Sequence, residues 1–402
     1  MRWIKSPGWD LVWILNPLWL APLVLLLARG HDDVRASPVD GLFFALTVPL
    51  WFGHRVSSAW LAYATPAYRP LLATQRLRFV VAPLAIAVAC FGLLLAPENV
   101  LPMPLTDRVL CFAVLDYLLV SHHFAAQHFG LLSLYRARAG RTSDALARQL
   151  DRWFALVVGG GFVVLAEALA GSIAFQEHWI DPLLGTAGGS GVFGRTLHDC
   201  GIVLIAILTA LMLGVELGSQ RPSLPRVGYV LAVSAMVLFA FLARDPFLFI
   251  VLWSVQHWSA AMGLTSLAAS GAAQASGRRW QRLLAPINQR GWAVLLVLAV
   301  VSALLLPVME VEAVSDEYAY ADRIFGEAAR WLRSSPFVPA LLALGFAAGF
   351  IHYLLDRAAF RFSSPEVRQA ARGLLQPGSK PAATIPARAS VRASLAGGLR
   401  SQ

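Results

Sequence analysis

Charged residues are scarce in this chain. Of its 402 residues only 14% are charged and 57% are hydrophobic, whereas a soluble globular domain has about 25% charged residues. This composition excludes an ordinary soluble domain. The uncharged runs 79–97 and 292–309 are each long enough to cross a hydrocarbon core of about 30 Å. The sequence therefore predicts an all-α, polytopic integral membrane protein.

Cysteines are few, and the common nucleotide-binding and hydrolase motifs are absent. The three cysteines, Cys90, Cys111 and Cys200, lie in or near apolar runs without CxxC spacing, so we expect small buried side chains and no disulfide framework. No GxGxxG, Walker A or GxSxG sequence occurs in the setting that its chemistry needs. The net charge of +10 is interpreted as a sign of membrane orientation, and no nucleic-acid partner is expected.

Hydropathy predicts about ten transmembrane helices. They are expected at residues 11–28, 40–63, 79–97, 109–135, 153–175, 196–218, 226–243, 246–269, 292–309 and 336–356. Residues 1–357 would form the transmembrane domain. Residues 358–402 are rich in Ala, Ser, Pro, Gly and Arg, which predicts a basic, disordered cytoplasmic tail lying near anionic membrane lipids.

The distribution of basic residues predicts the orientation. With the N-terminus in the cytoplasm, the inner segments hold 24 of the 33 Lys and Arg residues and the outer loops hold eight. The positive-inside rule expects this asymmetry. Both termini are therefore predicted to be cytoplasmic, in a bacterial-type inner (plasma) membrane that the chain crosses many times.

Histidines are frequent where a membrane protein seldom has them. Six of the nine fall inside the predicted spans 40–63, 109–135, 246–269 and 336–356. At a rise of about 1.5 Å per residue they lie about 16 to 28 Å below the outer end of each span. Ionisable groups at such depths must face a protein interior or a wet cavity. We therefore expect the four spans to converge on one polar site in the cytoplasmic half.

A histidine cluster drawn from several helices indicates a metal site, because neutral imidazole is the commonest protein metal ligand. The candidate ligands are His54, His122, His123, His128, His257 and His352. Nearby polar residues could complete or orient this set. The candidate carboxylate or orienting partners are Asp116, Gln127, Glu216, Gln256 and Tyr353.

Two resemblances are limited to residue type. The cluster resembles the histidine-rich di-iron desaturases and hydroxylases of membranes, although their HxxxH and HxxHH boxes are absent. The adjacent pair His122 and His123 resembles the copper-binding pair of haem–copper oxidases, without the other ligands of that family. No family is assigned on these grounds.

The favoured function is an integral-membrane metalloenzyme, a non-haem iron oxygenase, hydroxylase or desaturase. It would act on a lipophilic small-molecule substrate and take electrons from a donor protein. Imidazole ligands also suit copper. Two alternatives stay open: a haem-binding protein of electron transfer or haem handling, and a proton-coupled transporter.

The charge asymmetry makes a topological prediction. A reporter enzyme that is active only outside the cytoplasm should be silent when it is fused after Gln402. Fusion at the predicted outer loop near Asp32 should give an active reporter and serves as the positive control. An active fusion at the C-terminal end would contradict the predicted orientation.

Overall fold

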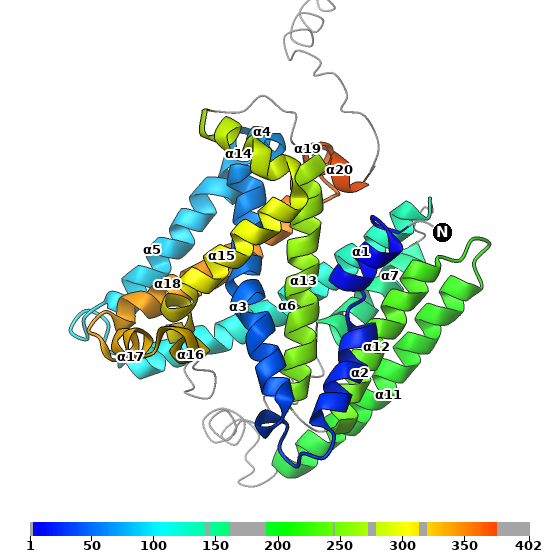
Figure 1. Cartoon of the computed structure of the whole chain (residues 1–402), viewed down its shortest axis with the longest axis horizontal. Helices are drawn as coiled ribbons and strands as arrows, with labels where there is room; N and C mark the ends of the chain where they lie inside the picture. The colour runs from blue at the N-terminus through cyan, green and yellow to red at the C-terminus, as the bar shows by residue number, and fades with distance from the viewer. Residues whose placement is uncertain are drawn as a thin grey trace, which may run out of the picture.

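The computed structural model describes residues 3–140, 145–160, 190–243, 246–271, 279–312 and 320–375. All regular secondary structure within these ranges is helical, and no strand occurs among them. The expected all-α class is therefore confirmed for the described part of the chain. Figure 1 shows α3 and α13 side by side near the middle of the bundle, with α5 at one edge and α11 at the other.

The bounds of the helices follow the apolar runs of the sequence. The α-helices are α1 (Pro7–Trp13), α2 (Pro17–Ala28), α3 (Pro38–Ala59), α4 (Arg69–Thr74), α5 (Ala82–Leu95), α6 (Leu105–Arg138), α7 (Ala145–Phe154), α11 (Ser190–Leu217), α12 (Leu224–Ala243), α13 (Pro246–Gly271), α14 (Arg279–Gln289), α15 (Gly291–Met309), α16 (Tyr320–Phe325), α17 (Glu327–Ser334), α18 (Val338–Ala359), α19 (Pro365–Ala370) and α20 (Arg372–Leu375). Three π-helical segments are η2 (Trp60–Ala64), η4 (Leu77–Val81) and η5 (Ala155–Gly159), and 3-10 turns are η1 (Val34–Ala36), η3 (Pro66–Tyr68) and η7 (Glu310–Glu312).

Among the residues that the structure describes, five helices are long and apolar enough to cross a membrane. They are Leu77–Leu95, Leu105–Arg138, Asp199–Leu217, Gly291–Met309 and Val338–Ala359. The helices α1 and α2 would add a sixth span if the pair, which bends by 51°, crosses as one unit. By length and composition, these helices indicate a membrane-embedded, polytopic protein.

The number of ten spans stays a prediction. The helices α3 and α13 cover the expected spans 40–63 and 246–269 but are not among the five. The apolar part of α12, Leu224–Phe239, is shorter than a full span. Most of the expected span 153–175 lies outside the described residues.

The helix α3 contains a proline and is supported by its neighbour α15. Pro49 lies inside α3, where it removes one backbone donor and disturbs the adjoining hydrogen bonds. The backbone N–H of Phe52 donates to Ser302 Oγ of α15 at 3.1 Å. This hydrogen bond ties the α3 backbone to a side chain of α15 two residues before His54.

The long helix α6 is tied to α5 by an arginine. Its 34 residues extend about 50 Å at the usual helical rise, which exceeds the thickness of a hydrocarbon core. The buried Arg108 of α6 donates to the carbonyl oxygens of Leu93 and Ala96, at 2.9 and 2.7 Å. A cation at the C-terminal end of a helix satisfies its last carbonyl groups and complements its dipole.

A buried ion-pair network joins four helices far from the histidines of α3 and α18. Arg226 of α12 contacts Asp151 of α7 and Glu216 of α11, and Arg136 of α6 donates to Asp151 at 2.6 Å. Two cations and two anions balance one another, as buried charges must. Glu216, which the sequence offered as a carboxylate partner of the metal site, is therefore engaged elsewhere.

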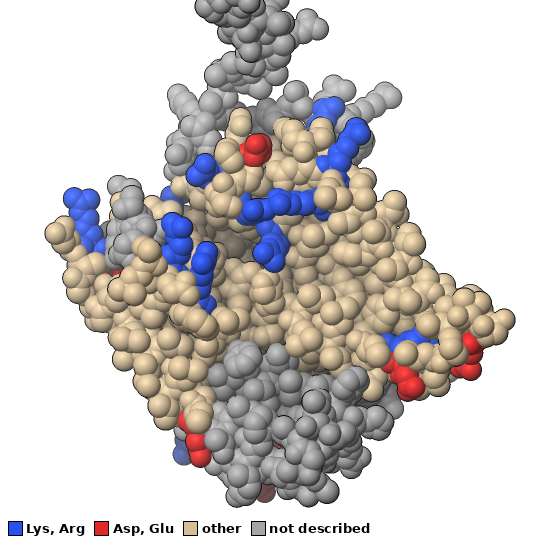
Figure 2. Space-filling view, turned by 180° about the vertical axis from the view of Figure 1, so that it is seen from behind, with Lys and Arg blue, Asp and Glu red and all other residues tan. Residues whose placement is uncertain are grey.

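The predicted tail begins with folded residues. Residues 365–375, assigned to the tail from the sequence, form α19 and α20, and Val367, Ala370 and Leu374 are buried in the main core. The remainder, 376–402, lies outside the described residues. In Figure 2 most visible Lys and Arg side chains lie in the upper part of the molecule, above a broad band with few charges. The positive-inside rule expects such a separation in a membrane protein.

Gly53 permits the close crossing of α3 and α15 beside His54. A Cβ atom added there would lie 2.9 Å from the backbone oxygen of Leu298 and 3.3 Å from Met262 Sδ. Gly53→Ala should therefore lower the free energy of unfolding by about 1–3 kcal/mol, the usual cost of overpacking. Thermal unfolding of the purified protein in detergent measures the effect.

Gly41→Ala in the same helix is the matched control, because nothing lies within 4 Å of its added Cβ. Alanine is favoured over glycine in a helix by up to about 1 kcal/mol, so this variant should be as stable as the parent or more stable. Equal stability of both variants would contradict the close crossing.

Candidate metal centre

Four histidines from four helices meet inside the bundle. His54 lies on α3, His123 on α6, His257 on α13 and His352 on α18, and all four are buried. The helix α3 packs against α13 and α18, and α18 packs against α6. We call these four residues the histidine cluster.

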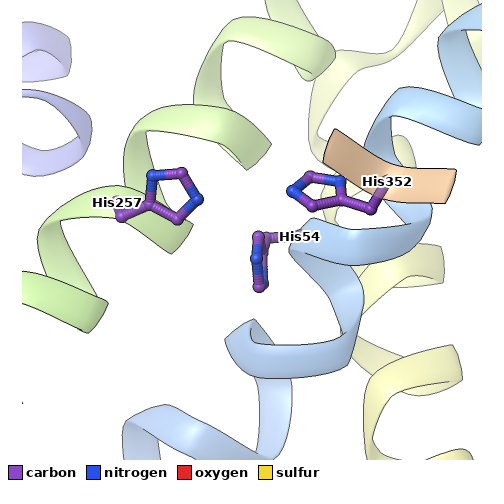
Figure 3. Close-up of side chains that lie close together, drawn as sticks. All are labelled: His54, His257 and His352. Carbon is purple, nitrogen blue, oxygen red and sulfur yellow. The ribbon is translucent and has the colours of Figure 1, made fainter. Parts of the chain in front are cut away.

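The ring nitrogens of the cluster are unusually close. Nε2 of His123 lies 3.1 Å from Nε2 of His257 and also 3.1 Å from Nε2 of His352. His54, His257 and His352 each place one ring nitrogen in a second group, and these three nitrogens all lie within 4.8 Å of one another. Figure 3 shows these three rings turned toward a common space from three different helices.

Contacts at the opposite nitrogens orient three of the four rings. Nδ1 of His54 is hydrogen-bonded to the carbonyl oxygen of Trp51, and Nδ1 of His352 lies 3.1 Å from Ser58 Oγ. Nδ1 of His123 faces the carboxylate of Asp356 at 3.9 Å. A group that accepts the Nδ1 proton leaves the Nε2 lone pair free for a metal ion, as is usual for ligating histidines.

Hydrogen bonds alone do not satisfy the close nitrogens. A neutral imidazole nitrogen carries either one proton or one in-plane lone pair, so Nε2 of His123 cannot form two good hydrogen bonds at once. A metal ion can accept three lone pairs together. With metal–nitrogen bonds of about 2.0–2.1 Å, neighbouring ligand nitrogens lie about 2.9 to 3.4 Å apart. The observed 3.1 Å contacts fit such a centre.

The fourth ring, His257, is oriented by aromatic stacking instead. Its Nδ1 is buried and has no hydrogen-bond partner among the described residues. Phe124 stacks on the ring with centroids 3.7 Å apart and planes 18° apart, and Trp253 stacks on the other side of Phe124 at 3.8 Å. Trp258 stacks similarly against His54, with centroids 5.8 Å apart. These aromatic contacts hold the rings of His257 and His54 in place.

Two of the predicted ligands lie outside the cluster. His122 is exposed, because successive residues of a helix point about 100° apart and His123 takes the inward position. His128 is fully buried, but its Nδ1 lies 2.5 Å from the hydroxyl oxygen of Tyr229 on α12. The sequence could not separate these two from His123, since all three share one helix.

The residues predicted to complete or orient the metal site make contacts around the cluster. Tyr353 packs against His123, with ring centroids 4.8 Å apart, and donates to Asp116 at 3.0 Å. Gln127 donates to the backbone oxygen of His257 at 3.2 Å, and Gln256 donates to the backbone oxygen of Ile14 at 3.4 Å. None of these contacts places the side chain among the close ring nitrogens, so their role would be support.

Two residues that orient the cluster were absent from the predicted partners. Ser58 and Asp356 each follow a cluster histidine by four positions, His54 and His352 respectively. Residues four apart share a helix face, and this spacing is the signal that could have identified them. Here each contacts a histidine of another helix: Ser58 contacts His352, and Asp356 contacts His123.

Comparisons with known proteins identify no relative. No protein-family model, no curated protein and no solved structure matches the chain.

The adjacent residues His122 and His123 allow a sharp test of metal binding. His123→Ala removes the nitrogen that lies 3.1 Å from two others, so bound metal should fall to background. His122→Ala removes an exposed ring and should leave the metal content unchanged. Elemental analysis of the two purified proteins measures the difference, and equal metal in both would contradict the assignment.

Proposed function

We propose that this chain is an integral-membrane metalloenzyme, a non-haem iron oxygenase, hydroxylase or desaturase acting on a lipophilic substrate. The observation that carries the proposal is the pair of 3.1 Å contacts at Nε2 of His123. Four neutral imidazoles form a donor set that suits iron, copper or zinc. Iron is favoured because oxygen chemistry on apolar molecules is a common reason to bury a metal among membrane helices.

The cluster residues would hold the ion and leave room for reaction. His123 supplies a nitrogen that lies close to those of His257 and His352. His54 supplies a fourth nitrogen, within 4.8 Å of the nitrogens of His257 and His352. An iron ion held by these residues would supply the oxygen and electron-transfer chemistry, with electrons from a donor protein. The Trp51 carbonyl and Ser58, which contact Nδ1 of His54 and His352, would keep those two rings in the ligating tautomer. The Asp356 carboxylate, 3.9 Å from Nδ1 of His123, would favour a proton on that nitrogen by its charge.

A lipophilic substrate could approach along the side where α6 and α18 pack together. His122 and Arg357 are both exposed there, although their chain neighbours His123 and Asp356 are buried. On α6 the exposed His122 is the chain neighbour of the cluster residue His123, and on α18 the exposed Arg357 follows Asp356, whose carboxylate faces His123. Leu115 and Leu118 of α6 are also exposed and offer an apolar face to lipid on the same helix.

The haem alternative is less well supported by this geometry. Two axial histidines approach iron from opposite faces of a flat macrocycle, and the macrocycle occupies the plane between them. In the cluster each ring has at least two other imidazole rings nearby, with centroids 4.7 to 6.5 Å apart. Such packing favours a bare ion.

Product analysis tests the enzymatic proposal. A host that expresses the parent chain should accumulate lipids that have gained one oxygen atom or lost two hydrogen atoms, detected by mass spectrometry of extracts. His257→Ala should abolish these products, because the ring supplies a metal ligand. Ser58→Ala removes only a contact that orients His352 and should reduce them about 10- to 100-fold.

His31→Ala is the matched control, since His31 is exposed and lies outside the cluster. It should leave the products unchanged. Full product levels in His257→Ala, with the protein present in the membrane, would overturn the proposed function.

A further inference from the structure

A second pair of buried polar side chains lies apart from the histidine cluster. His128 of α6 and Tyr229 of α12 are both fully buried, and His128 Nδ1 lies 2.5 Å from the Tyr229 hydroxyl oxygen. The contact therefore joins a phenol and an imidazole directly, as an acid and a base within hydrogen-bond reach.

The chemistry of the two groups allows the phenol to donate. In the neutral tautomer of His128 whose proton lies on Nε2, Nδ1 carries a lone pair that can accept the proton of the Tyr229 hydroxyl. That Nε2 is buried without a hydrogen-bond partner among the described residues. A buried N–H group without a partner destabilises the fold by its lost hydration. A histidine that only joined two helices would gain nothing from this.

The chain makes specific room for the His128 ring. A Cβ atom added at Gly159 would lie 2.5 to 2.7 Å from three atoms of the His128 side chain, so only glycine fits there. Gly159 ends the π-helical segment η5, a form often found at functional sites. Trp253 donates to the Gly159 carbonyl at 3.0 Å.

Stacked rings connect this pair to the histidine cluster. Trp253 stacks on Phe124, and Phe124 stacks on His257 of the cluster. The Trp253 indole also donates to the Gly159 carbonyl, and Gly159 lies directly against the His128 ring. One route of contacts thus joins the pair to the cluster, from His128 through Gly159, Trp253 and Phe124 to His257.

We infer that Tyr229 is a redox-active tyrosine and that His128 is its proton acceptor. Tyr229 would give one electron to the oxidised metal centre of the cluster, and its phenol O–H bond would break as the proton passes to Nδ1 of His128. The products are a neutral tyrosyl radical, an imidazolium on His128 and a metal centre reduced by one electron. The inference rests on the proposed function, which supplies the oxidant.

Tyr68 shows what a buried tyrosine with a structural role looks like in the same chain. It is also fully buried, but its hydroxyl donates to the backbone carbonyl of Ala359 at 3.2 Å. A backbone carbonyl oxygen does not take up a phenol proton, so the hydrogen-bond partner of Tyr68 cannot serve as the base that His128 provides for Tyr229. Tyr68→Phe is therefore the matched control for Tyr229→Phe.

The full-length protein in detergent, loaded with ferrous iron, should be mixed with dioxygen, frozen rapidly and examined by electron paramagnetic resonance. We expect a tyrosyl radical that couples to nitrogen-15 when the histidines are labelled. The signal should vanish in Tyr229→Phe and persist in Tyr68→Phe. His128→Gln, which keeps a polar side chain, should remove the nitrogen coupling and lower the radical yield.

The outcomes separate this inference from the proposed function. Bound iron without a Tyr229-dependent radical, or lipid products formed by Tyr229→Phe at the parental rate, would overturn the inference alone. A radical that is unchanged in His128→Gln would also overturn it. Failure of the parent chain to bind iron would overturn both proposals.

Discussion

The structure depends on how four imidazoles are buried together among apolar helices. A polar ring in a medium of low dielectric constant needs a partner, and here the partners of the rings are largely other rings: Nε2 of His123 lies 3.1 Å from two others. Because an imidazole nitrogen has one proton or one lone pair, hydrogen bonds among the rings cannot satisfy all of these nitrogens. A cation that accepted their lone pairs would satisfy them. The packing of α3, α6, α13 and α18 follows from bringing these rings to one place.

The helix α3, which carries His54, is locally irregular near that residue. Pro49 disturbs α3 shortly before His54, and the backbone N–H of Phe52 donates to Ser302 of α15. Gly53 allows the α15 backbone to approach directly beside His54. Such features are costly in an isolated helix and are tolerated where a neighbouring helix compensates for them. The site therefore depends on α15, although α15 contributes none of the four histidines.

Polar groups in this chain fall into separate layers with different chemistry. The cluster offers lone pairs to an ion, His128 and Tyr229 form an acid–base pair, and the network around Arg226 balances two cations against two carboxylates. The carboxylate of Glu216 is held by Arg226, so Glu216 serves the charge network and not the cluster.

The sequence by itself determined the helical class and the apolar helices, since hydropathy follows from composition. It also predicted that six histidines share a depth, from the helical rise, and the four that meet in the structure, His54, His123, His257 and His352, are among those six. It did not separate His123 from His122 and His128, because the inward face of α6 is set by the helices that pack on it. The partners Ser58 and Asp356 contact histidines of other helices, and the pairing of His128 with Tyr229 spans 101 positions. Only the tertiary structure decided these contacts, because they depend on the rotation and crossing of packed helices, which local periodicity does not encode.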